Sequence, residues 1–220
     1  MVGDIIAYVS RFLALMLALS VHEFAHAFVA VKLGDLTPKI NGRYSLNPLA
    51  HFDILGLICF VFIGFGWAKP VPVNPNNFKR PKRDMLFVAA AGVVANYILA
   101  FLFYPLFVLS VYVPRFGYFT DVLQLSLYYA FYFSIVFFIF NLLPIYPLDG
   151  FRIVDTFVKK RGESYYAFRK YGIYVLYALI ILNAVARITG IVYFNVLGIA
   201  INFLYKYVSY PITAFWGLFL

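Results

Sequence analysis

Long apolar runs, each interrupted by few charges, dominate the pattern of hydrophobic and polar positions along the chain. A helix needs about 20 mainly apolar residues to span the hydrocarbon core of a bilayer. Five runs are long and apolar enough, and we expect each to form a transmembrane helix. They cover residues 5–33, 85–113, 122–143, 171–188 and 191–207.

A sixth apolar run, residues 52–65, looks too short to span the membrane, and we expect a re-entrant or shallow element there. If it does cross, the number of spans rises to six. Before it, the polar stretch 36–46 contains the dipeptide Asn41-Gly42, which favours a type I′ turn and predicts a small two-stranded ribbon. The predicted fold class is an all-α polytopic membrane protein of about five to six transmembrane helices, with a small β-hairpin or re-entrant insertion after the first helix.

Composition agrees with a single domain embedded in a membrane. Of the 220 residues, 64% are hydrophobic and only 12% are charged, and the mean hydropathy is +0.87. These values lie far outside the usage of soluble domains. We expect residues 1–220 to form one domain, with a catalytic core at about residues 5–160 and C-terminal helices at residues 165–220. No cleavage site follows the first run, so we expect it to be retained.

The net charge of +9 comes largely from two basic clusters, residues 69–83 and 152–170. In a membrane protein such clusters follow the positive-inside rule, so we expect no nucleic-acid partner and place both clusters in the cytoplasm. Five spans then put the N-terminus outside and the C-terminus inside. If residues 52–65 cross, this asymmetry weakens. The small size and the lack of targeting signals favour a prokaryotic inner membrane, with the active site toward the cytoplasm.

The first apolar run carries the pattern H-E-x-x-H at residues 22–26. His22 and His26 are four residues apart and share one helix face, so both imidazoles can bind one metal ion. Glu23 lies beside them as a general base for a water on that metal. Three ionisable side chains inside an apolar span are costly in lipid and indicate function. The alternative is a polar cluster that only ties helices together.

Catalytic zinc usually has three protein ligands and one water, so the chain should supply one more ligand. Asp149, at the cytoplasmic end of the third run, is the best candidate, and we expect one Zn²⁺ per chain. Pro144 and Pro147 disfavour helix just before them, so the span should unwind here and make a wet pocket beside Asp149. The alternative is that Asp149 only caps the amphipathic helix predicted at residues 147–160.

These residues and several further motifs resemble the site-2 protease family of intramembrane metalloproteases, in a compact form without PDZ or CBS domains. The motifs are H-E-F-A-H at 22–26, N-P-L-A-H at 47–51, G-W-A-K-P-V-P-V-N-P at 66–75, G-V-V-A-N at 92–96 and N-L-L-P-I-Y-P-L-D-G at 141–150. The resemblance implies a zinc ion held by His22, His26 and Asp149. It also implies that Glu23 activates water and that Asn141 helps to stabilise the oxyanion or to position the substrate.

The chain departs from the family pattern at Val93, where proline is usual, and at Phe151, where a second glycine is often found. Neither departure removes a ligand. We expect Asn96 to be an interhelical hydrogen-bonding group rather than a site residue. We likewise expect His51, in a loop, to pack structurally, and Cys59 to be packing material without a role.

The predicted function is an intramembrane zinc endopeptidase that cuts single-span membrane proteins in or near their transmembrane segments. The main alternative is a metal-ion transporter or channel, because buried His and Asp beside a broken helix also describe an ion pathway. A proteolytically inactive homologue that binds membrane segments is another. A zinc peptidase with glutamate as third ligand is disfavoured, because Glu163 lies in a basic loop.

A helical substrate hides its backbone carbonyls in its own hydrogen bonds, so it must unwind before cleavage. A strand edge at residues 36–46 or 71–73 would then be available to pair with the unwound segment by β-augmentation. The oligomeric state, the natural substrate and the scissile bond do not follow from the sequence.

Overall fold

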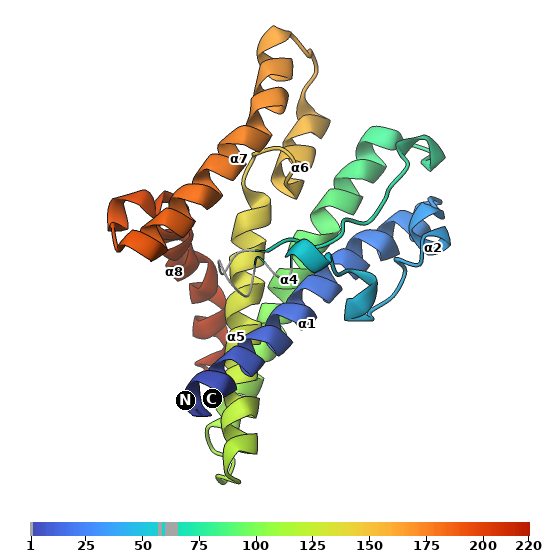
Figure 1. Ribbon diagram of the computed structural model, residues 1–220. Helices are drawn as coiled ribbons and strands as arrows, with labels where there is room; N and C mark the ends of the chain where they lie inside the picture. The colour runs from blue at the N-terminus through green and yellow to red at the C-terminus, as the bar shows by residue number, and fades with distance from the viewer. Residues whose placement is uncertain (1, 57–58, 60–65) are drawn as a thin grey trace.

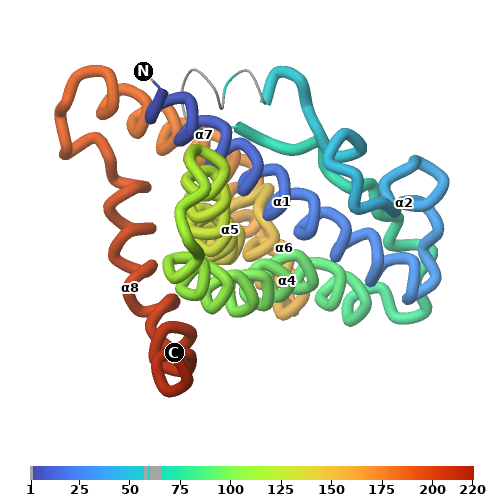
Figure 2. Tube along the Cα trace, turned by 90° about the horizontal axis from the view of Figure 1, so that it is seen from below, coloured from blue at the N-terminus to red at the C-terminus, as the bar shows by residue number. Residues whose placement is uncertain are grey.

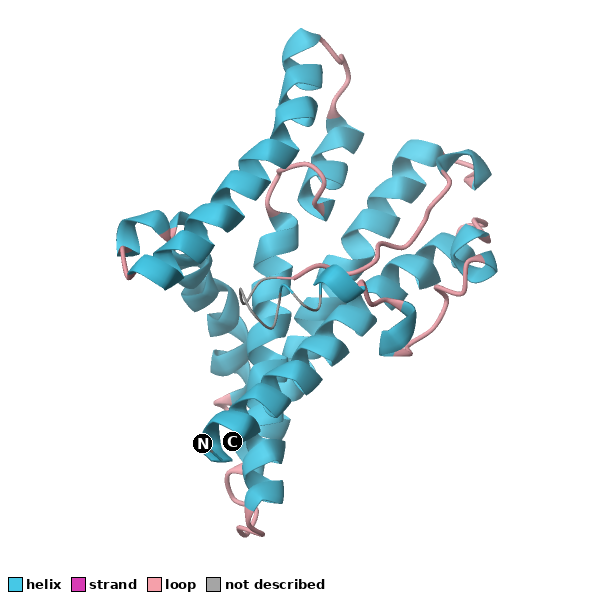
Figure 3. Ribbon diagram, in the orientation of Figure 1, coloured by secondary structure: helices cyan, strands magenta, loops and turns pink. Residues whose placement is uncertain are grey.

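The computed structural model describes residues 2–56, 59 and 66–220, and this part of the chain is almost entirely helical (Figures 1 and 3). The α-helices are α1 (Val2–Lys32), α2 (Thr37–Ile40), α4 (Pro81–Ser110), α5 (Tyr118–Leu142), α6 (Asp149–Phe157), α7 (Glu163–Thr189) and α8 (Val196–Trp216). Short 3-10 turns are η1 (Pro48–Ala50), η2 (Pro75–Asn77) and η3 (Val192–Phe194). An antiparallel bridge between Phe52 and Ala68 is the one β pairing among the described residues.

Four of the described helices, α1, α4, α5 and α7, are long and apolar enough to cross a membrane. Many large apolar side chains on their outer faces are exposed, as a lipid-facing surface requires. These helices identify an integral membrane protein. The first three predicted spans match α1, α4 and α5 to within a few residues, whereas α7 begins at Glu163 and α8 begins at Val196, each some residues away from its predicted start.

Helices α1, α4 and α5 form the closely packed centre of the molecule. Figure 2 looks nearly along α5, with α1 and α4 passing on either side of it. Small residues let these backbones approach, since Ala18 and Ala27 of α1 and Ala100 of α4 are all 0% exposed. Close approach between small side chains is a common mode of helix packing in lipid. It gives the candidate site residues described below a closely packed support.

A second apolar cluster joins α8 to this centre. Its buried members are Ala100, Phe131, Ile135, Ile139 and Ile212, from α4, α5 and α8. The indole Nε1 of Trp216 also donates a hydrogen bond to the carbonyl oxygen of Phe101 at 2.9 Å. The C-terminal helix is therefore docked on α4 and α5.

The chain unwinds after α5, as the two prolines predict, and resumes as α6 at Asp149. Gly150 allows α6 to approach the end of α5 closely, because a Cβ there would lie 2.2 Å from the carbonyl oxygen of Leu142. Phe151 is buried against aromatic rings on both sides, with ring centroids 5.5 Å from Tyr146 and 6.0 Å from Phe168. Phe151, which stands where the family pattern often has a second glycine, thus packs α6 against α7.

The predicted two-stranded ribbon at residues 36–46 is wrong, because the chain forms the short helix α2 there. Asp35 accounts for the difference: its Oδ1 accepts hydrogen bonds from the backbone N–H of Thr37 at 3.1 Å and from its hydroxyl at 2.5 Å. This local bonding turns the chain into a helix before the Asn-Gly dipeptide is reached. Gly42 does adopt a positive φ of 68°, but Asn41 has φ −87°, whereas a type I′ turn needs both positive.

The expected re-entrant element at residues 52–65 lies largely outside the described residues. At its ends, the backbone N–H of Lys69 donates to the carbonyl oxygen of His51 at 2.9 Å, beside the Phe52–Ala68 bridge. Residues 69–74 then run without helix across the second half of α1, as predicted for a proline-rich segment.

Candidate active site

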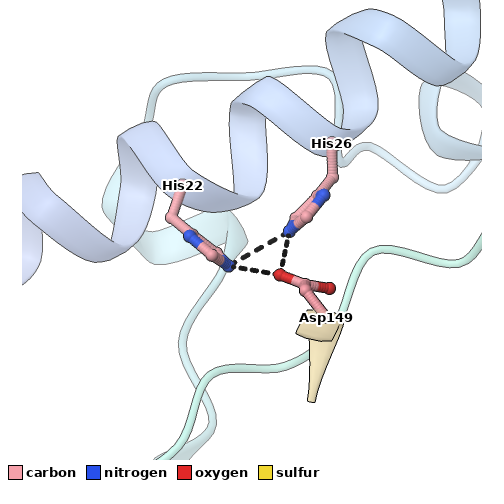
Figure 4. Close-up of side chains that lie close together, drawn as sticks. All are labelled: His22, His26 and Asp149. Carbon is pink, nitrogen blue, oxygen red and sulfur yellow. Dashed lines mark hydrogen bonds and ion pairs between the residues drawn. The ribbon is translucent and has the colours of Figure 1, made fainter. Parts of the chain in front are cut away.

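Helix α1 places His22 and His26 one turn apart with both rings pointing to the same side (Figure 4). Their Nε2 atoms are 3.0 Å apart, and the two residues are 5% and 6% exposed. The Nδ1 atom of His26 lies 2.7 Å from the carbonyl oxygen of Val88. A carbonyl can only accept, so Nδ1 of His26 carries the proton and its Nε2 keeps a free lone pair.

Asp149 brings a carboxylate to the same point from α6. Its Oδ2 lies 3.2 Å from Nε2 of His22 and 3.0 Å from Nε2 of His26, and the residue is 6% exposed. Figure 4 shows the carboxylate facing both rings. Asp149 is the first residue of α6, whose N-cap is Leu148, so its side chain faces the histidines and does not serve as the cap of that helix.

The three converging atoms fit a zinc ion. A tetrahedral site with bonds of about 2.0–2.1 Å separates its ligand atoms by about 3.3 Å. The observed separations of 3.0, 3.0 and 3.2 Å are close to that value. Lone pairs at such distances repel each other, and a cation between them removes that repulsion. Two imidazoles and one carboxylate also leave one position open, as catalytic zinc sites do.

Gly92 of α4 makes the space that this cluster occupies. A Cβ at position 92 would lie 2.3 Å from Nε2 of His26 and 2.7 Å from Cε1 of His22, far closer than real contacts allow. The helix backbone of α4 therefore forms one wall of the site, and any side chain here would displace the imidazoles.

Glu23 lines the same cavity, which has a volume of about 120 Å³. The backbone N–H of Val71 donates to its Oε2 at 3.2 Å, which fixes the carboxylate beside the histidines. The extended segment with Pro70, Val71 and Val73 forms one wall of this cavity. The structure thus brings the carboxylate of Glu23, a cluster that could hold a metal ion and an extended backbone segment together.

Asn141 and Arg152 complete the cavity on the side of α5 and α6. The Nδ2 of Asn141 donates to the carbonyl oxygen of Phe137 at 3.1 Å, which leaves the second amide hydrogen free. Arg152 lies three residues after Asp149 on the same face of α6. The sequence reasoning did not single out this arginine, although its i+3 spacing from Asp149 was a usable signal.

Asp35 anchors the extended segment to the end of α1. It is 0% exposed, and its Oδ2 accepts the backbone N–H of Asn74 at 2.8 Å while Oδ1 accepts Nδ2 of Asn77 at 2.7 Å. Burial alone would raise the pKa of this carboxyl, but the hydrogen bonds from Thr37, Asn77 and Asn74 outweigh burial and hold the pKa below its usual value. A charged Asp35 therefore holds the segment that positions Glu23.

The remaining candidates lie as follows. His51 is apart from the cluster, and its Nε2 lies 2.7 Å from the carbonyl oxygen of Ser45, in keeping with the predicted structural role. Cys59 is a free thiol outside the cavity. Asn96 makes the interhelical contact expected of it, but its partner is His22, with Nδ2 3.2 Å from Nδ1. The sequence did not connect the two, because only folding brings α4 against α1.

Comparisons with known proteins point to zinc metalloproteases. The model of peptidase family M50 matches residues 118–183. The "Putative zinc metalloprotease YwhC" of Bacillus subtilis (strain 168) is 42% identical over 148 residues, which cover 66% of this chain and 68% of that protein. The "Putative zinc metalloprotease Rip2" of Mycolicibacterium smegmatis is 25% identical over 178 residues, covering 78% of this chain and 66% of that protein. No solved structure matches significantly.

Both relatives are named as zinc metalloproteases, and neither name points to a transporter or an inactive binding protein. Together with the cluster of two histidines and an aspartate in apolar helices, these matches assign a zinc cofactor and a hydrolase. The chain therefore belongs to peptidase family M50, the site-2 protease family of intramembrane zinc metalloproteases.

Proposed function

We propose that His22, His26 and Asp149 hold the catalytic zinc and that Glu23 is the general base and acid of peptide hydrolysis. The observation that carries this proposal is the convergence of Nε2, Nε2 and Oδ2 within 3.2 Å, next to a carboxylate that is not a ligand. When bound, zinc supplies Lewis acidity that polarises the scissile carbonyl and the attacking water.

Glu23 takes a proton from the attacking water and returns it to the leaving nitrogen. The bond from Val71 to Oε2 leaves Oε1 as the oxygen for this transfer. Asn141 uses one amide hydrogen within α5, so its second hydrogen is available to the developing oxyanion of the substrate carbonyl. These roles give the two catalytic residues separate tasks.

The substrate class that fits this site is a single-span membrane protein whose helix has unwound locally. The edge at Val71 and Val73 supports this proposal, since an extended substrate strand can pair with an extended backbone segment. A separate, larger and mostly apolar cavity, of about 300 Å³, lies along helices α1 and α5, with Met16 and Leu19 of α1 and Phe137 of α5 in its lining. It offers room for apolar side chains of the remaining substrate helix.

The proposed topology has five spans, with α8 as the fifth, the N-terminus outside and the C-terminus inside. Lys69 and the four basic residues of 79–83 then lie on the cytoplasmic side together with the basic residues of 152–170. His22 and His26 lie in the second half of α1, so the active site is nearer the cytoplasm. A prokaryotic inner membrane is the proposed location, and one domain spanning residues 1–220 is the proposed unit.

The test compares the parent with Glu23→Gln in detergent or liposomes, on a panel of single-span substrates with helix-weakening residues. Glu163→Gln is the matched control, because Glu163 begins α7 and lies outside the cavity. We expect zinc in all three proteins, parent-like cleavage by Glu163→Gln, and loss of cleavage in Glu23→Gln by mass spectrometry. Cleavage by Glu23→Gln at the parent rate would refute the role of Glu23.

A further inference from the structure

The two histidines of the cluster are oriented by different kinds of partner. Nδ1 of His26 faces the backbone carbonyl of Val88 at 2.7 Å, whereas Nδ1 of His22 faces the carboxamide of Asn96, whose Nδ2 is 3.2 Å away. A backbone carbonyl fixes the tautomer of His26, because it can only accept. The tautomer of His22 depends on a side chain.

Asn96 is placed for this task by α4. It lies one turn after Gly92, on the helix face that packs against both imidazoles, and it is 0% exposed. Its Oδ1 is buried and has no hydrogen-bond partner among the residues that the structure describes. A carboxamide oxygen without a partner in the middle of an apolar helix bundle is costly, so its chemistry needs an explanation.

A rotation of the carboxamide by 180° exchanges Nδ2 and Oδ1, so that Oδ1 faces Nδ1 of His22 and Nδ2 takes the other position. With Nδ2 facing the ring, Nδ1 of His22 must accept, and the ring proton sits on Nε2, where it points at Asp149 and His26. With Oδ1 facing the ring, Nδ1–H donates to Oδ1, and the lone pair of Nε2 is free for a metal ion.

We propose that Asn96 is a positioning residue that accepts the Nδ1 proton of His22 through Oδ1 and so holds His22 in the tautomer that binds zinc. This inference rests on the proposed role of His22 as a zinc ligand. It replaces the simpler role of Asn96 as a group that only ties α4 to α1. Val88 acts through its backbone carbonyl, which a side-chain substitution does not remove. Position 96 is therefore the place at which a substitution can change how the histidine pair is oriented.

The test measures zinc affinity by competition with a chromophoric chelator, and the apo-protein melting temperature, for Asn96→Leu and Asn96→Asp. Leucine removes the acceptor at similar size, while aspartate keeps an acceptor at the same place. Asn183→Leu is the matched control, since Nδ2 of Asn183 donates to Oδ1 of Asn195 in the C-terminal part of the chain, away from the zinc site.

We expect Asn96→Leu to bind zinc about 10- to 100-fold more weakly than the parent, as for other residues that orient a ligand. Asn96→Asp should bind within about 3-fold of the parent, and Asn183→Leu should bind as the parent does. In the Co²⁺-loaded proteins, the visible spectrum of Asn96→Leu should differ from that of the parent, and that of Asn96→Asp should not.

Two outcomes overturn the proposal: parent-like zinc affinity of Asn96→Leu, or an Asn96→Asp variant as weak as Asn96→Leu. The first outcome, combined with a lower melting temperature of the apo-protein, would show that Asn96 only stabilises the packing of α4 against α1. If Asn96→Leu does not fold, Asn96→Ala takes its place in the same comparison. His22→Ala distinguishes a failure of this inference from a failure of the proposed function, since full zinc affinity in that variant would refute the proposed ligand set itself.

Discussion

The protein has two regions of apolar helices that bury very different amounts of their surface. One is the centre formed by α1, α4 and α5, and the other is the C-terminal pair α7 and α8. Eleven residues of α1 are buried, against three each in α7 and α8. Figure 1 shows α7 leaning away from the central helices, and Figure 2 shows α8 set apart from α1. Apolar composition thus indicates contact with lipid, whereas buried small and polar residues indicate the region that holds the candidate active site.

The polar residues make the same distinction. His22, His26, Asn96 and Ser134 are buried within the central helices. In the C-terminal part, the bond between Asn183 and Asn195 is only partly buried. Substitutions in the two regions should therefore affect catalysis very differently, and three comparisons test this.

The largest effect is expected for Gly92→Ala. Its Cβ would lie 2.3 Å from Nε2 of His26, so both imidazoles must move and the ligand cluster is lost. We expect zinc to fall from about one per chain to near zero and cleavage to fall by at least about 100-fold. Elemental analysis and a cleavage assay measure both.

Gly162→Ala is the control for that change, because a Cβ at position 162, just before α7, meets nothing within 4 Å. It should keep parent-like zinc content and activity. A Gly92→Ala protein with full zinc and full activity would mean that α4 can withdraw from the site, and the central helices would not be the closely packed support inferred here.

An intermediate effect is expected for Asp35→Asn. The change removes the charged acceptor that holds Asn74 and Asn77, so the segment carrying Val71 loosens and Glu23 loses its orientation. We expect cleavage to fall about 10-fold, since removing an orienting residue beyond the ligands typically costs about 10–100-fold, with zinc retained. Asp155→Asn, which removes the charged acceptor of Arg161 and Tyr165, should leave cleavage unchanged.

The pH dependence of stability sharpens this second comparison. The pKa of Asp35 in the folded protein is below its unfolded value. Its contribution to the stability of the fold is therefore present above about pH 4 and is lost as pH falls through the folded pKa. The difference in melting temperature between parent and Asp35→Asn should be constant from neutral pH to about pH 4–5 and then shrink. A difference that grew on acidification would contradict this assignment.

The smallest effect is expected for Trp216→Phe, which removes the hydrogen bond from Nε1 to the carbonyl oxygen of Phe101 and keeps most of the aromatic packing. We expect a loss of about 0.5–1.5 kcal/mol in stability, measured by unfolding in detergent, and unchanged kcat. A clear fall in kcat would show that the docking of α8 helps to shape the site.

Much of the fold follows from local sequence properties. The apolar runs determined the positions of α1, α4 and α5, because a backbone in lipid must satisfy its hydrogen bonds internally and only a helix of sufficient length does so. The prolines at 144 and 147 likewise determined the end of α5. The hairpin prediction failed because the Asn-Gly signal at 41–42 was weighed alone, without the competing helical turn that Asp35 begins.

For the site, the sequence by itself determined that His22 and His26 share a helix face and that Glu23 stands beside them, since four-residue spacing is local geometry. It also singled out Asp149 as the best candidate for a third ligand. Only the tertiary structure decided that Gly92 leaves room for the imidazoles and that Asn96 faces His22, because these contacts join residues about 70 positions apart. Local spacing determines which residues share one helix face, whereas contacts between helices depend on packing that no single segment encodes.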